Sequence, residues 1–150
     1  MADPDDIRAW QRLDATLTTS GRITKADVPR LAELGLRHVI NLALATHPEA
    51  LADESALLAA AGIGYTHIPV PFDAPDESHF AAFCTAIDAA ARPLHVHCIM
   101  NWRVSAFFYR YHREVLGMAE NEARGLMEQQ WCPETEPHPD AAAWARFIRR

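Results

Sequence analysis

Cys98 and Arg103 are the two residues whose types and spacing most clearly suggest chemistry. Cys98 follows a short alternating run over residues 94–97 that predicts a strand, and from Arg103 onward apolar residues recur at helical spacing. Cys98 should therefore lie at a strand-to-helix turn, where unpaired N–H groups and the positive end of the helix dipole favour a thiolate and bind anions. The planar guanidinium of Arg103 would add donors suited to a tetrahedral oxyanion. The sequence thus predicts a nucleophile and an oxyanion clamp in one loop.

The order His97-Cys98, then Arg103 and Ser105, between a predicted strand and a predicted helix, resembles the signature loop of cysteine-dependent protein phosphatases of the tyrosine and dual-specificity superfamily. Those enzymes usually have five residues between Cys and Arg, a Gly in mid-loop and a hydroxyl residue directly after the Arg. Here four residues intervene, Asn101 stands where a Gly is usual, and Ser105 follows Arg103 after one more residue. This Cys-x4-Arg spacing is similar to that of many rhodanese-type sulfurtransferases and of a bacterial phosphatase-like family.

The sequence upstream of the loop resembles the bacterial phosphatase-like family. The likeness covers residues 19–24, a helical segment ending at Gly35 and an apolar strand over residues 38–42, and with the loop it extends from about residue 19 to residue 111. It implies a dual-specificity-phosphatase-like fold. The alternation of strands and helices independently predicts a three-layer α/β/α domain with a mainly parallel sheet, whose ligand site lies beyond the carboxyl ends of the strands. We expect residues 1–150 to form one such domain.

The resemblance also implies a role for each residue of the loop. Cys98 would attack phosphorus and form a phosphocysteine, which makes this a phosphoric monoester hydrolase that needs no metal or organic cofactor. His97 would support the loop, and Ser105 would hydrogen-bond the thiolate. Asn101 would also brace the shortened loop with its side-chain amide. The residues expected to bind the phosphoryl group are Ile99, Met100, Asn101, Trp102, Arg103 and Ser105.

Hydrolysis also needs a proton for the leaving oxygen and then a base for the attacking water. In the superfamily an Asp supplies both from the loop after the strand that precedes the Cys strand, and here that loop is residues 71–78. Asp73 comes directly after the expected strand end, whereas Asp76 lies at an acidic helix start. We therefore expect Asp73 rather than Asp76 to be the general acid.

Two other functions are compatible with the same loop. A rhodanese-like sulfurtransferase would carry a persulfide on Cys98, and a pseudophosphatase would bind phosphate without turnover. His95 and His97, two positions apart, could also suggest metal ligands, but no third ligand stands at a recognisable spacing, which favours hydrogen-bonded histidines. The substrate, phosphotyrosine in a protein or a small phosphorylated molecule, stays open, as does the oligomeric state.

Composition narrows the class of protein. With 49% hydrophobic and 23% charged residues the chain is an ordinary globular one, and its net charge of −6 argues against nucleic-acid or anionic-membrane partners. Cys84, Cys98 and Cys132 form no CxxC pair, so a disulfide framework or structural zinc is not expected. The first residues lack the features of a signal peptide, and no apolar stretch is long enough for a membrane span. We expect a cytoplasmic protein.

Periodicity and punctuation predict the remaining elements. A capping box at Thr24 and Asp27 should begin the helix that Gly35 ends, and Ser78 should cap another. Strands are expected over residues 17–19, 38–42, 64–70 and 94–97. Helices are expected over residues 7–17, 24–35, 53–61, 78–91, 103–116, 119–130 and 137–150.

Overall fold

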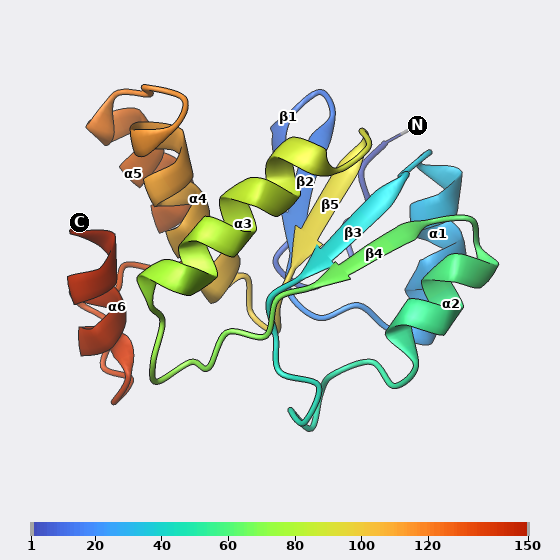
Figure 1. Cartoon of the computed structure of the whole chain (residues 1–150), viewed down its shortest axis with the longest axis horizontal. Helices are drawn as coiled ribbons and strands as arrows, with labels where there is room; N and C mark the ends of the chain where they lie inside the picture. The colour runs from blue at the N-terminus through green and yellow to red at the C-terminus, as the bar shows by residue number, and fades with distance from the viewer. Residues whose placement is uncertain (1, 150) are drawn as a thin grey trace.

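A five-stranded sheet forms the centre of the computed structural model, which describes residues 2–149 (Figure 1). Its strands are β1 (Gln11–Asp14), β2 (Leu17–Ser20), β3 (His38–Asn41), β4 (Gly64–His67) and β5 (Leu94–His97). They lie in the order β1-β2-β5-β3-β4, and only β1 is antiparallel to its neighbour. The expected mainly parallel sheet is therefore confirmed. Positions 1 and 150, the ends of the expected domain and of its last helix, lie outside the described residues.

The expected helix over residues 7–17 is wrong, because β1 occupies part of it. Strand β1 turns directly into β2 and pairs with it, with Gln11 opposite Thr19. The turn is closed by the Asp14 carboxylate, which accepts a hydrogen bond from the Thr16 N–H at 2.7 Å. Such a side-chain-to-backbone bond two residues on is typical of Asp in turns. Ile7, Trp10, Leu13 and Leu17 do recur at near-helical spacing, but pairing with β2 decides the structure of residues 11–14.

Helices cover both faces of the sheet, which confirms the three-layer α/β/α class (Figure 1). On one face a short 3-10 turn (Lys25–Asp27), α1 (Val28–Glu33) and α2 (Glu54–Ala60) bury a core that includes Val39 of β3. On the other face the larger core includes Ile40 and Val96. Its helices are α3 (Glu77–Ala89), α4 (Trp102–Glu114), α5 (Glu120–Glu128) and α6 (Ala141–Ile148). None of the helices in residues 2–149 is long and apolar enough to cross a membrane.

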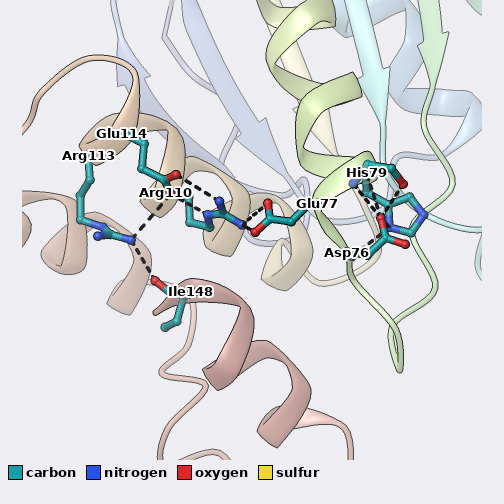
Figure 2. A network of polar contacts seen from close by, with 8 residues as sticks. Asp76, Glu77, His79, Arg110, Arg113, Glu114 and Ile148 are labelled. Carbon is teal, nitrogen blue, oxygen red and sulfur yellow. Dashed lines mark hydrogen bonds and ion pairs between the residues drawn. The ribbon is translucent and has the colours of Figure 1, made fainter. Parts of the chain in front are cut away.

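Side-chain caps set two of the helix starts. The predicted capping box is present, with the Asp27 carboxylate 2.8 Å from the Thr24 N–H. In α3 the cap is Asp76, not the expected Ser78: its Oδ1 accepts from the N–H groups of Ser78 and His79 at 2.9 and 3.1 Å (Figure 2). An Asp one residue before the helix reaches these first N–H groups, which have no partner inside the helix.

Arg110 of α4 contacts residues of three helices of the larger core. Figure 2 shows its bonds to Glu77 and Glu114. Its guanidinium donates to Glu77 of α3 at 3.0 Å and to Glu114 of its own helix at 2.6 Å. The same group lies 4.1 Å from the ring centre of Phe80 and 4.7 Å from that of Phe147 in α6. The cation thus keeps its hydrogen bonds while packing between two rings. Through these contacts α6 is fixed relative to α4.

Candidate active site

Cys98 lies at the carboxyl edge of the sheet, immediately after β5. In the parallel register His97 is opposite both Ser20 of β2 and Asn41 of β3, so the loops after all three strands leave the sheet at one edge. The chain then runs through residues 98–101 into α4, which confirms the predicted strand-loop-helix arrangement. Cys98 is buried.

Six consecutive backbone N–H groups after Cys98, those of residues 99–104, donate no hydrogen bond to any described residue. The first bonded amide of α4 is that of Ser105, which donates to the Asn101 carbonyl at 3.0 Å. Unpaired N–H groups at the start of a helix of this length form an anion site, because their partial positive charges add to the helix dipole. The donors needed to hold an oxyanion therefore surround the start of α4.

Asn101 fixes the conformation of the loop. It has φ 65°, a left-handed conformation that Asn tolerates better than most residues other than Gly. Its side-chain amide donates to the Ala9 carbonyl at 2.9 Å and to the Thr19 hydroxyl at 3.0 Å, so it braces the loop as expected. On the other side Gly21 passes so close to the loop that an added Cβ would lie 2.4 Å from the Ile99 carbonyl oxygen. Asn101 thus meets the backbone requirement that a Gly usually meets.

His97 is buried between two oxygen atoms. Its Nδ1 lies 3.0 Å from the Cys98 carbonyl and its Nε2 lies 2.6 Å from Oε2 of Glu54, the first residue of α2. A carbonyl only accepts, so Nδ1 donates its proton to the Cys98 carbonyl, while Nε2 faces the Glu54 carboxyl group. Through these two contacts His97 supports the Cys98 loop, and Glu54 supports His97.

Glu54 also affects Tyr65. Burial and the nearby Glu54 charge raise the pKa of Tyr65 to about 12, so its hydroxyl stays protonated.

Arg103 is buried in the first turn of α4 and is aimed by one hydrogen bond. Its Nη1 donates to the carbonyl of Val70, after β4, at 2.9 Å, and its guanidinium carbon lies 5.6 Å from the ring centre of Phe72. Its Nε and Nη2 donate to no described residue. Two donors of the guanidinium fork thus stay available for a bound oxyanion.

A cavity of about 470 Å³ contains both Cys98 and Arg103 in its wall. Its volume falls within the range of about 300–1,000 Å³ that is usual for small-molecule sites. Four segments that are far apart in sequence form it: the loop after β3, Phe72 in the loop between β4 and α3, the Cys98 loop with the start of α4, and the segment before α6. The lining residues are Leu44, Thr46, His47, Phe72, Cys98, Ile99, Met100, Trp102, Arg103, His138 and Asp140.

Two of the predicted site residues lie elsewhere. Asp73 is exposed and lines a different depression, together with Arg146 and Phe147 of α6. Ser105 is buried in α4, where its hydroxyl donates to the Trp102 carbonyl at 3.1 Å, a bond within its own helix. The roles expected for Asp73 as acid and for Ser105 as thiolate partner stay predictions that this arrangement does not support.

Comparisons with known proteins agree with the fold. A family model for the phosphatase-like domain of beta-lactamase hydrolase-like proteins matches residues 9–109, two thirds of the chain. The chain belongs to this family. No curated protein matches it.

Several solved structures share the fold of this family member. A candidate phosphatase (DUF442) from Shewanella putrefaciens CN-32 is 28% identical, covering 95% of this chain and 89% of that one, with a TM-score of 0.77. TpbA from P. aeruginosa, in a cysteine-to-serine variant complexed with phosphotyrosine, is 22% identical over 97% and 87%, with a TM-score of 0.72. Tk-PTP in its active form is 14% identical over 93% and 95%, also at 0.72. Family and neighbours together support a phosphatase with the tyrosine-phosphatase-like fold.

Sequence reasoning missed several residues of the site in this family member. Glu54 had one signal, an acidic residue at the start of a predicted helix, but its burial against His97 depends on packing. His47 follows a parallel strand and could have been placed near the carboxyl edge by topology. His138 and Asp140 lie beyond the family-matched residues 9–109 and had no spacing signal at all. In residues 2–149 no group of three His, Cys, Asp or Glu side chains is placed to hold a metal ion.

Proposed function

We propose that this chain is a cysteine-dependent phosphatase that hydrolyses phosphomonoesters through a phosphocysteine on Cys98. One observation carries the proposal: Cys98, the six unpaired N–H groups of residues 99–104 and the free donors of Arg103 meet at one cavity. Phosphoryl transfer needs a nucleophile in line with the leaving oxygen and donors for the three remaining oxygens. The Cys98 loop supplies both from adjacent residues.

The wall of the cavity supports an aryl phosphate as the substrate class. Phe72 and Trp102 lie with ring centres 6.1 Å apart, and Leu44, Ile99 and Met100 add further apolar surface. Trp102 is itself held by stacking on Trp131, with ring centres 4.6 Å apart and planes within 4°. A flat apolar leaving group gains from contact with such rings. TpbA, which shares the fold, binds phosphotyrosine, and we propose phosphotyrosine-like esters for this chain as well.

The test is hydrolysis of p-nitrophenyl phosphate by the reduced protein and by Cys98→Ser. We expect the variant to lose at least about 10³-fold in kcat, since a Ser hydroxyl is not ionised at neutral pH. Cys132→Ser is the matched control, because Cys132 is a free cysteine outside the cavity wall, and it should keep the wild-type rate. Equal rates for wild type and Cys98→Ser would overturn the proposal. In that case sulfur loading of Cys98 from thiosulfate would be measured next.

A further inference from the structure

Asp140 is the only carboxylate that lines the Cys98 cavity in the part of the chain that the structure describes. It is the residue just before α6, the position at which an Asp side chain normally accepts hydrogen bonds from the first N–H groups of the helix. Here the side chain makes no such bond, and no described residue donates to it. The half-buried carboxyl group therefore has no hydrogen-bond partner among the described residues, and its residue lines the same cavity as the buried Cys98 and Arg103.

Asp73 is kept away from the cavity by the residue before it. The ring of Phe72 forms part of the cavity wall, and its carbonyl accepts a hydrogen bond from the indole N–H of Trp144, in α6, at 2.7 Å. The same ring packs on Trp131 and on His138, with centres 5.9 and 5.0 Å away. Turning Asp73 inward would break these contacts, which α6 and its preceding segment supply.

The two histidines of the cavity wall each accept a hydrogen bond from the backbone. His47 Nδ1 accepts from the Glu49 N–H at 3.0 Å, and His138 Nδ1 accepts from the Asp140 N–H at 3.1 Å. In both, a backbone N–H two residues on occupies Nδ1, so the ring proton is on Nε2. Each ring therefore offers an Nε2–H donor to its surroundings.

We propose that Asp140 is the general acid and base of the hydrolysis, an assignment that rests on the proposed phosphatase function. In the first step the Cys98 Sγ–P bond forms and the P–O bond to the leaving group breaks. The bonding pair goes to the leaving oxygen, which takes the proton of the Asp140 carboxyl group. In the second step water attacks phosphorus and gives its proton to the Asp140 carboxylate. The S–P bond breaks, its pair returns to Cys98 and phosphate is released.

The test compares Asp140→Asn with Asp73→Asn on phenyl phosphate and p-nitrophenyl phosphate, with kcat followed from pH 4.5 to 8. Phenolate needs a proton to leave far more than p-nitrophenolate does. Asp140→Asn should therefore lose about 10²–10⁴-fold on phenyl phosphate and clearly less on the nitrophenyl ester. The fall of kcat at high pH, which reports loss of the acid's proton, should disappear in this variant. Asp140→Glu keeps a carboxyl group and should recover part of the rate.

Asp73→Asn should stay within about threefold of wild type with the same pH profile. The assignment is overturned if Asp73→Asn shows these losses and Asp140→Asn does not. It is also overturned if Asp140→Asn loses equally on both substrates with an unchanged pH profile, because that result indicates a structural role. Cys98-dependent hydrolysis that Asp140→Asn leaves unchanged overturns the Asp140 assignment alone. Absence of Cys98-dependent hydrolysis overturns the phosphatase function and the assignment together.

Discussion

The residues around Cys98 are held by buried polar contacts rather than by the loop itself. His97 and Glu54 are both nearly inaccessible, with side-chain exposures of 3% and 4%, and meet at 2.6 Å. A buried pair of this kind contributes less than its short distance suggests, because both groups lose hydration. Removing one partner is costly, since the other is then left buried without a hydrogen bond. Glu54 is therefore a positioning residue that acts on Cys98 through His97.

Glu54→Ala should destabilise the protein by about 3–5 kcal/mol, and Glu54→Gln by clearly less. The amide of Gln can still donate to His97 Nε2, so that Nδ1–H keeps its bond to the Cys98 carbonyl. Urea unfolding of the two variants measures the difference. At pH 7 without denaturant, kcat on p-nitrophenyl phosphate should fall in Glu54→Gln as well, because an amide replaces the carboxyl group that faces His97 behind the Cys98 loop. Equal stability of Glu54→Ala and wild type would show that the pair holds nothing in place.

At the scale of the elements, α6 matters for the site because the segment just before it, with His138 and Asp140, closes one wall of the cavity. Its position depends on Arg110, which is 4% exposed and packs against Phe147, and on Trp144, which binds the Phe72 carbonyl. A second arginine network, Arg124 with Glu120 and Glu134, lies on α5 with the Arg side chain 31% exposed. The two networks have similar charges and differ in burial.

Arg110→Met should lower the free energy of unfolding by about 1–3 kcal/mol, because charge-assisted hydrogen bonds and ring contacts of a buried cation are lost. Arg124→Met is the matched control and should cost less than about 1 kcal/mol, since exposed ion pairs are weak. Raising the salt concentration should shrink the Arg124 effect more than the Arg110 effect. Chemical unfolding of both variants at low and high salt measures this. A larger loss for Arg124→Met would contradict the burial argument.

At the scale of the whole molecule, the layer between the sheet and α1 contains a fully buried histidine. His95 accepts from the Thr18 hydroxyl at Nδ1 and donates from Nε2 to Ser20, each at 2.8 Å, and stacks on Trp10. The Ser20 hydroxyl in turn donates a hydrogen bond to the Gly21 carbonyl at 2.8 Å, so every polar atom of the network has a partner when the His95 ring is neutral. Burial, with a smaller contribution from the charge of His97, holds the pKa of His95 well below its usual value.

The unfolding free energy should therefore decrease as pH falls below about 6.5. Below that pH the unfolded chain binds a proton at His95, whereas the folded protein keeps His95 neutral. The free energy of unfolding therefore falls toward acid pH and rises again as pH increases. The contribution approaches about 1.4 kcal/mol per pH unit. His95→Gln should flatten the pH dependence between pH 6.5 and 5 by up to this amount. Burial also lowers the pKa values of His38 and His112, but both residues are present in wild type and variant. The difference between the two pH curves therefore reports His95. Parallel curves would contradict this account.

Much of the fold follows from local patterns. Four of the five strands, the helix that begins at the Thr24 box and the turn that contains Cys98 are each encoded by neighbouring residues, and the structure confirms them. The strand β1 (Gln11–Asp14), which forms a hairpin with β2, was missed because a four-residue strand with charged neighbours carries too little periodic signal. The predicted strand over residues 64–70 extends three residues beyond the end of β4 at His67. The N–H groups of Ile68 and Val70 still donate to the carbonyls of residues 41 and 42, but Pro69 has no N–H to continue the ladder.

The sequence by itself determined the centre of the proposed site, because Cys98, Arg103 and the loop between them are close together in the chain and their placement is local. Only the tertiary structure decided which groups surround them. Whether Asp73 or Asp140 reaches the cavity depends on the packing of α6 against Phe72, and whether His97 finds a carboxylate depends on where α2 begins. These contacts join residues 43 and 72 positions apart. No spacing rule encodes them, because they form only when helices on two faces of the sheet pack at the same carboxyl edge.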